Sequence, residues 1–119
     1  METLKSLLKE LTDLDGINAA VVINRDGFMI SGMMRSGEVD MEFMAAIISA
    51  GVGSSEQMAR QLQLGAINLS MVECERGVAM VMLLSKEAVM AVVADPSATI
   101  GSIRYQLKKR IDDIRNALR

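Results

Sequence analysis

The chain has 119 residues, half of them hydrophobic and only 3% aromatic, and its 13 basic and 15 acidic side chains leave a net charge of −2. This length suits a single domain, residues 1–119, and the balanced charge gives no electrostatic reason to expect nucleic acid or an anionic membrane as partner. Because histidine is absent and Cys74 is the single cysteine, an internal disulfide and a Ser-His-Asp or Cys-His nucleophile are excluded within one chain.

The first predicted element is an amphipathic helix near the N-terminus. Its leucines recur at steps of three and four: Leu4, Leu7, Leu8, Leu11 and Leu14. Gly16 is placed to end this helix in a left-handed conformation. Charged residues interrupt the leucines, which is unlike a signal peptide, and no run of about 18 apolar residues follows. We therefore expect a cytoplasmic protein without a membrane-spanning segment.

A strand hairpin is predicted next. The apolar stretch within Ile17–Asn24 favours a strand covered on both faces. Arg25-Asp26-Gly27 has the composition of a tight hairpin turn, and Phe28–Gly32 returns as a second strand. The following segment, Met33–Asp40, is predicted to be a surface loop because it contains Ser36-Gly37-Glu38.

A long helix over Met41–Gln63 is apolar on two sides. One stripe, typical of a core face, comprises Met41, Met44, Ala45, Ile48, Val52, Ser55, Ala59 and Leu62. A second stripe lies nearly opposite and comprises Phe43, Ala46, Ile47, Ala50 and Ser54. A sheet can cover the first stripe, and the second needs another cover, which in so small a domain points to another protein chain.

Three strands and a final helix complete the order α-β-β-α-β-β-β-α. Ala66–Cys74 alternates apolar and polar residues and is predicted near a sheet edge, whereas Val78–Leu84 and Ala88–Ala94 are continuously apolar central strands. The helix over Ile100–Leu118 has one apolar stripe. The pattern predicts an α/β fold of the α+β type: a three-layer sandwich with a five-stranded antiparallel sheet, the long helix on one face and the terminal helices on the other.

Residue clusters that could carry chemistry have plainer interpretations. Gly51-Val52-Gly53 lacks the lysine and the strand-to-helix context of a phosphate loop, and Asp26 suits the turn. Asp112 and Asp113 point apart on a helix, and Cys74 has acidic neighbours that oppose thiolate formation. A basic cluster, Arg104, Lys108, Lys109 and Arg110, has no aromatic residues beside it that would favour nucleic acid. We predict no catalytic residue, metal or cofactor, and no enzyme activity.

Several segments resemble the Roadblock (dynein light chain) family. The stretch from Gly16 to Gly27 looks like the opening signature of that family, and Ala45-Ala46 and Ile100–Arg104 also resemble it. The likeness covers almost the whole chain and points to the MglB-like prokaryotic members. It implies a longin/profilin-like fold with strand order 2-1-5-4-3. It also implies dimers in which the third strands pair edge to edge and the long helices lie side by side.

The resemblance further implies a function in protein binding. Relatives of this kind bind a Ras-like small GTPase and promote its hydrolysis of GTP, and others are scaffolds or motor-complex subunits. We expect a homodimer whose contacts are Phe43, Ala46, Ile47, Ala50, Ser54, Asn68, Ser70 and Val72. We expect a GTPase to contact Glu42, Gln57 and Gln61. No arginine finger is marked, although Arg25 and Arg60 are exposed candidates, so any activation is expected to be indirect.

Two alternatives stay open from the sequence. The chain could be an assembly or motor-complex subunit without a GTPase partner. It could also be a small-molecule sensor, which requires a polar-lined cavity between sheet and helix.

Overall fold

A computed structural model describes residues 3–35 and 39–118. Within these ranges three helices and five strands follow one another in the predicted order. They are α1 (Leu4–Thr12), β1 (Ile17–Asn24), β2 (Met29–Met34), α2 (Met41–Gln61), β3 (Leu69–Cys74), β4 (Gly77–Leu83), β5 (Ala88–Ala94) and α3 (Ile100–Ala117).

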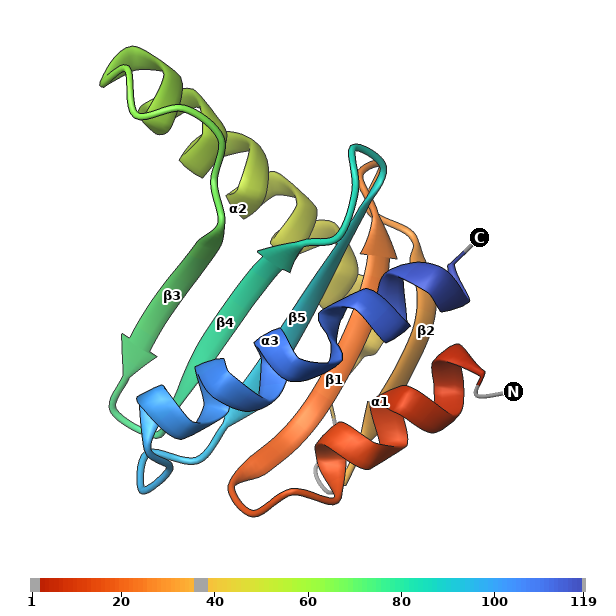
Figure 1. The fold of residues 1–119 in the computed structure, drawn as a ribbon. Helices are drawn as coiled ribbons and strands as arrows, with labels where there is room; N and C mark the ends of the chain where they lie inside the picture. The colour runs from red at the N-terminus through yellow and green to blue at the C-terminus, as the bar shows by residue number, and fades with distance from the viewer. Residues whose placement is uncertain (1–2, 36–38, 119) are drawn as a thin grey trace.

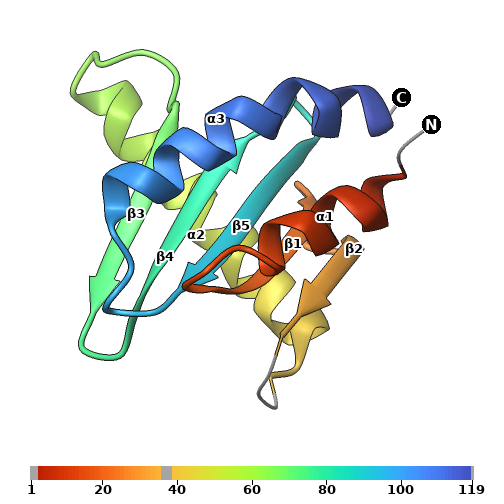
Figure 2. The same cartoon turned by 60° about the horizontal axis from the view of Figure 1, so that its bottom comes forward.

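The five strands form one antiparallel sheet in the order β2-β1-β5-β4-β3 (Figure 1). Helices α1 and α3 cover one face, and α2 lies behind the other, as the tilted view also shows (Figure 2). The predicted α+β fold class and the strand order implied by the family resemblance are therefore confirmed. Strands β1 and β5 take the middle because their unbroken apolar runs can be covered on both sides.

The two faces of the sheet have cores of different size. Under α1 and α3 a large cluster includes Leu7, Leu8, Leu11, Ile17, Val22, Met80, Met90, Ile103, Leu107 and Ile114. Under α2 the buried cluster comprises Val21, Ile23, Ala45, Val52, Val89 and Ala91. The α2 face thus holds much less buried apolar volume, although α2 is the longest helix of the described chain.

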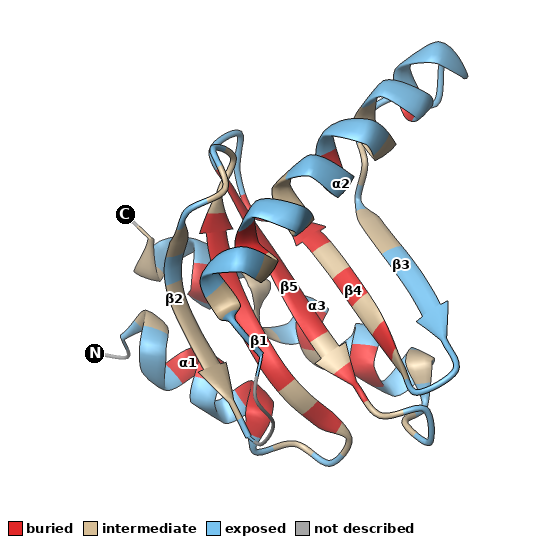
Figure 3. Cartoon of the chain, turned by 180° about the vertical axis from the view of Figure 1, so that it is seen from behind, coloured by how far each residue is buried: buried red, intermediate tan, exposed pale blue. Residues whose placement is uncertain are grey.

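Strand β4 lies inside the sheet, as its continuously apolar sequence predicted, but the single chain covers only one of its faces. Val78, Met80 and Met82 are buried under α3, but their alternating neighbours on the α2 side are only half buried. Figure 3 shows the reason: α2 crosses β2, β1 and β5 and then extends past the strand ends, so that no helix of the described chain lies over β4 and β3 on this face.

Several predicted boundaries shift by a few residues. Met33 and Met34 belong to β2 rather than to the predicted loop, of which residues 36–38 lie outside the described ranges. Helix α1 ends at Thr12 instead of Leu14, and the Arg35 guanidinium donates hydrogen bonds to the carbonyls of Thr12 and Leu14 at that end.

Two other segments also differ from the predicted bounds. Helix α2 ends at Gln61, two residues early, and β3 begins at Leu69 rather than Ala66. Gly16 has the predicted positive φ, +86°, in the turn into β1, where a Cβ atom would lie 2.9 Å from Ala98 Cβ.

Candidate protein interface

The outward face of α2 is apolar and uncovered. The helix begins where the Asp40 side chain accepts hydrogen bonds from the backbone N–H groups of Glu42 and Phe43. Beyond this cap Phe43 is 65% exposed and Ile47 is 56% exposed. All five helix residues predicted to make dimer contacts are exposed or half exposed: Phe43, Ala46, Ile47, Ala50 and Ser54. The single chain therefore leaves them open to a partner.

The apolar face continues further along α2 than the sequence predicted. Met58 and Leu62 are 59% and 60% exposed. The prediction that Leu62 lies on the core stripe is wrong because the end of α2 extends past the sheet (Figure 3). The missed signal was the spacing of Ser54, Met58 and Leu62, which places them on one side of a helix.

The edge strand β3 offers the second part of this surface. It pairs with β4 on one side, and its other edge is free within the described chain. Ser70 and Val72 stand opposite Val81 and Ala79 in the register, and Val81 packs toward the α2 core, so all four lie on the α2 side. Asn68, also predicted to make dimer contacts, is exposed just before the strand.

We define the α2-side surface by two sets of residues. It comprises the helix residues Phe43, Ile47, Ala50, Ser54 and Met58 and the strand residues Ser70, Val72, Ala79 and Val81. Figure 3 shows both sets of elements on one side of the molecule, with the pale exposed helix beside the pale edge strand. This arrangement could accept both a helix and a strand from a second chain.

The β1–β2 turn fixes the direction of α2. Arg25 in this turn forms an ion pair with Glu56 of α2, and the Ser49 hydroxyl donates a hydrogen bond to the Arg25 carbonyl. Gly27, at φ +94°, lies so close to the helix that a Cβ atom there would be 3.3 Å from Ala46 Cα. Arg25 was predicted to be exposed, but its side chain is only 28% exposed because of this pairing.

The residues predicted for GTPase contact lie on the same helix. Glu42, Gln57 and Gln61 are exposed, as is Arg60, the other arginine-finger candidate. Gln57 and Gln61 continue the row of Ala50 and Ser54 at helical spacing. The structure therefore places both predicted sets on α2, with Glu42 in its first turn and Gln57 and Gln61 in its second half.

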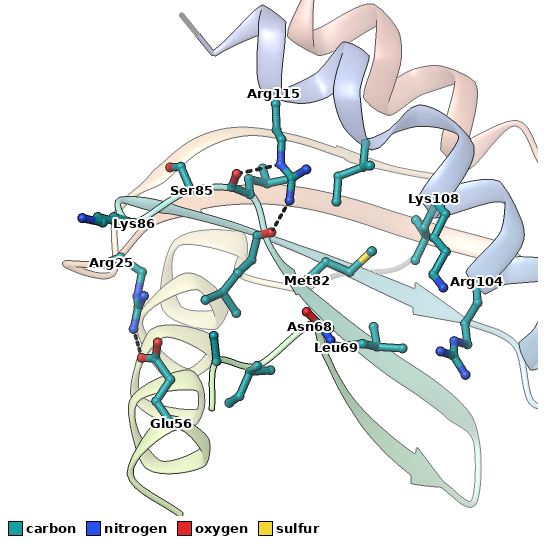
Figure 4. Close-up of a pocket in the computed structure, with 16 residues that line it drawn as sticks. Arg25, Glu56, Asn68, Leu69, Met82, Ser85, Lys86, Arg104, Lys108 and Arg115 are labelled. Atoms are coloured by element: carbon teal, nitrogen blue, oxygen red, sulfur yellow. Dashed lines mark hydrogen bonds and ion pairs between the residues drawn. The ribbon is translucent and has the colours of Figure 1, made fainter. Parts of the chain in front are cut away.

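A groove of about 710 Å³ runs along α3, past the β4–β5 turn and the segment before β3, and reaches Arg25 of the β1–β2 turn and Glu56 of α2 (Figure 4). Apolar side chains line it, among them Leu69, Met82, Leu107 and Ile111. Arg104 and Lys108 of the predicted basic cluster also line it, whereas Arg110 approaches Glu10 of α1 instead. The basic cluster is visible in the sequence, but the groove is not, because it forms from segments that are distant in the chain.

Metal-ligating side chains do not cluster in the described parts of the chain. Across residues 3–35 and 39–118 no three histidine, cysteine, aspartate or glutamate side chains gather as a metal site would require. Cys74, Asp112 and Asp113 are exposed at separate places. None of the helices in this part of the chain is long and apolar enough to cross a membrane.

Comparisons with known proteins agree on one family. Residues 3–94 match the profile of the Roadblock/LC7 domain. Uncharacterized proteins of Methanocaldococcus jannaschii are similar in sequence. One is 31% identical over 109 residues, which are 92% of this chain and 94% of the relative, and a second is 30% identical over the same shares.

Solved structures share the fold at low sequence identity. Myxococcus xanthus MglB superposes with a TM-score of 0.90 at 16% identity, covering 97% of this chain and 94% of that one. The gliding protein MglB of Thermus thermophilus gives 0.87 at 17% identity, covering 96% and 87%. A Roadblock/LC7 domain of Streptomyces avermitilis gives 0.87 at 20% identity, covering 98% of each chain.

Proposed function

The chain belongs to the Roadblock/LC7 family, and on this premise we propose that it is a homodimeric, non-catalytic protein that regulates or scaffolds a Ras-like small GTPase in the cytoplasm. The main support for this proposal is the exposed apolar α2-side surface. Exposed apolar patches of this extent mark interaction sites more often than ordinary monomer surface.

A second copy of the chain could cover the α2-side surface. Two β3 edges can pair antiparallel, and two α2 helices can then lie side by side over the uncovered β3–β4 strands. This arrangement satisfies the free backbone groups of an edge strand, which otherwise invite uncontrolled pairing. One MglB structure that shares the fold is described as having a tetrameric arrangement, which is a property of that protein and fits a family that self-associates.

The GTPase is proposed to sit across the paired helices. Glu42 would contact it from the first turn of α2, and Gln57 and Gln61 from the second half of the helix. Arg25 is engaged by Glu56 and is poorly placed to reach into another active site. The dimer is therefore proposed to act indirectly, by favouring the arrangement of the GTPase in which its own catalytic groups are in place.

The test is single-turnover GTP hydrolysis by a Ras-like GTPase from the same organism, with and without this protein. We expect binding to the dimer, and acceleration if the protein is an activator rather than a scaffold. Gln57→Ala with Gln61→Ala should weaken binding while dimer mass is kept, and Lys5→Ala, on the far helix α1, is the control. Absence of binding to every such GTPase would instead favour the alternative of an assembly subunit.

One observation supports the further alternative that the protein is a small-molecule sensor. The groove beside α3 has a volume within the range of ligand sites, about 300–1,000 Å³. It mixes apolar and charged lining residues, as such a site requires.

A further inference from the structure

The groove beside α3 has a charge pattern that the GTPase proposal does not use. Its lining includes the cationic residues Arg25, Lys86, Arg104, Lys108 and Arg115. Glu56 is the single acidic residue among the described residues that line it, and it is already paired with Arg25. The chain carries a net charge of −2, so this concentration of positive charge is local.

Three of these cations have no acidic partner among the described residues. Lys86, Arg104 and Lys108 form no ion pair there. Arg115 is held differently: its Nε donates a hydrogen bond to the Leu84 carbonyl at 2.8 Å, and its Nη2 donates one to the Leu83 carbonyl at 3.3 Å (Figure 4). These bonds fix the guanidinium at the end of the groove, where its Nη1 also lies 3.6 Å from the Asp112 carboxylate, which offsets part of its charge.

The positive charges follow the length of α3. Arg104, Lys108 and Arg115 lie at steps of four and seven, on one side of the helix, and span roughly 16 Å at the rise of an α-helix. The apolar residues Leu107 and Ile111 lie between them and line the groove together with Leu69 and Met82 of the sheet. An elongated ligand with several negative charges and apolar side chains matches this surface better than a compact anion does.

We propose that this groove binds an acidic, amphipathic peptide segment of a partner protein, with its apolar side chains on the partly exposed Leu69 and Ile111 and its carboxylates near Arg104, Lys108 and Arg115. Charge complementarity supplies orientation and association rate, and the apolar lining supplies the buried contact area. The proposed peptide contacts lie along α3 and the proposed GTPase contacts lie on α2, although the groove reaches Glu56 of α2 at its far end, so the peptide and a GTPase could be bound together.

The probe is a fluorescein-labelled peptide of about 14 residues, enough for roughly four helical turns, in which leucines recur at steps of three and four and the remaining positions are mostly glutamate. Fluorescence polarisation measures its binding to the full chain. We expect Arg104→Glu with Lys108→Glu to weaken binding at least tenfold. The matched control, Lys5→Glu with Lys109→Glu, makes the same change in net charge at exposed positions outside the groove and should alter binding less than twofold.

Two changes to the probe separate charge from apolar contact. A peptide with lysine in place of glutamate should not bind, and one with alanine in place of leucine should bind at least tenfold more weakly. Equal binding of the acidic and basic peptides, no binding of the acidic one, or equal loss in the control variant would overturn the proposal.

The same variants distinguish a peptide site from a self-association surface and from a lipid site. The mass of the Arg104→Glu, Lys108→Glu protein by sedimentation should equal that of wild type, and its circular dichroism should be unchanged. A fall to monomers would assign the groove to self-association and overturn the proposal. Cosedimentation with phosphatidylserine vesicles, or displacement of the peptide by decanoate at micromolar concentration, would assign it to a lipid surface or a small amphiphile instead and would likewise overturn it.

Discussion

The two faces of the sheet differ in how completely one chain covers them. On the α1 and α3 side, Leu8, Leu107 and Ile114 are fully buried and the core closes without help. On the α2 side the long helix crosses only part of the sheet and keeps Phe43 and Ile47 in solvent. One face is therefore closed within the chain, whereas the other stays open to solvent.

The largest expected effect is the loss of stability caused by a cavity in the core under α1 and α3. Leu107→Ala should lower the free energy of unfolding by about 2–5 kcal/mol, because it removes buried contacts and leaves a cavity. Urea unfolding monitored by circular dichroism measures this, with Lys109→Ala, exposed two residues further along α3, as the control. A loss below that range, equal to the control, would mean that this face is not the folding core.

A charge on the open face should instead affect association. Ile47→Asp should weaken dimerisation by about a hundredfold, since a carboxylate would be buried without a partner. Sedimentation equilibrium measures the change. Tyr105→Asp introduces the same residue at a similarly exposed position on α3 and should leave the dimer intact. Normal dimers of the Ile47→Asp protein would place the interface elsewhere.

The direction of α2 can be tested through its anchor. A double-mutant cycle with Arg25→Ala and Glu56→Ala should give a coupling of about 0.5–1 kcal/mol, because the pair is partly buried. Faster hydrogen exchange in the second half of α2 should accompany the loss. The exposed pair of Lys9 and Asp13 on α1 provides the comparison and should couple more weakly.

The smallest expected effect is that of adding a methyl group to α2 at Gly51. It tests whether a partner helix packs closely against α2 at this position. A Cβ atom at Gly51 meets nothing within 4 Å in the single chain, so Gly51→Ala should stabilise isolated α2 by roughly 0.5–1 kcal/mol. If the partner helix packs closely at this point, the same change should weaken the dimer. Gly101→Ala on α3 also meets open space and should leave dimerisation unchanged. Unaltered association in both variants would argue against close helix packing at Gly51.

Most of the fold could be predicted from the sequence because the informative patterns are local. The spacing of Leu4, Leu7 and Leu11 identifies α1, and the Asp26-Gly27 pair identifies the first hairpin turn. The second apolar stripe of α2 was also evident, and the structure leaves its residues accessible to solvent. Their role in dimer contact stays a prediction, as do the GTPase contacts at Glu42, Gln57 and Gln61.

Element order and the apolar face of each helix follow from the sequence alone, since side-chain periodicity repeats within a few residues. Only the packing of the elements in space shows how far α2 extends beyond the sheet, which exposes Leu62 and leaves β4 half covered. The same packing places Arg104 and Lys108 in a groove with Leu69. The physical reason is that both outcomes depend on the angles between elements. These angles are set by contacts between residues far apart in the chain, such as that of Arg25 with Glu56, which are 31 residues apart.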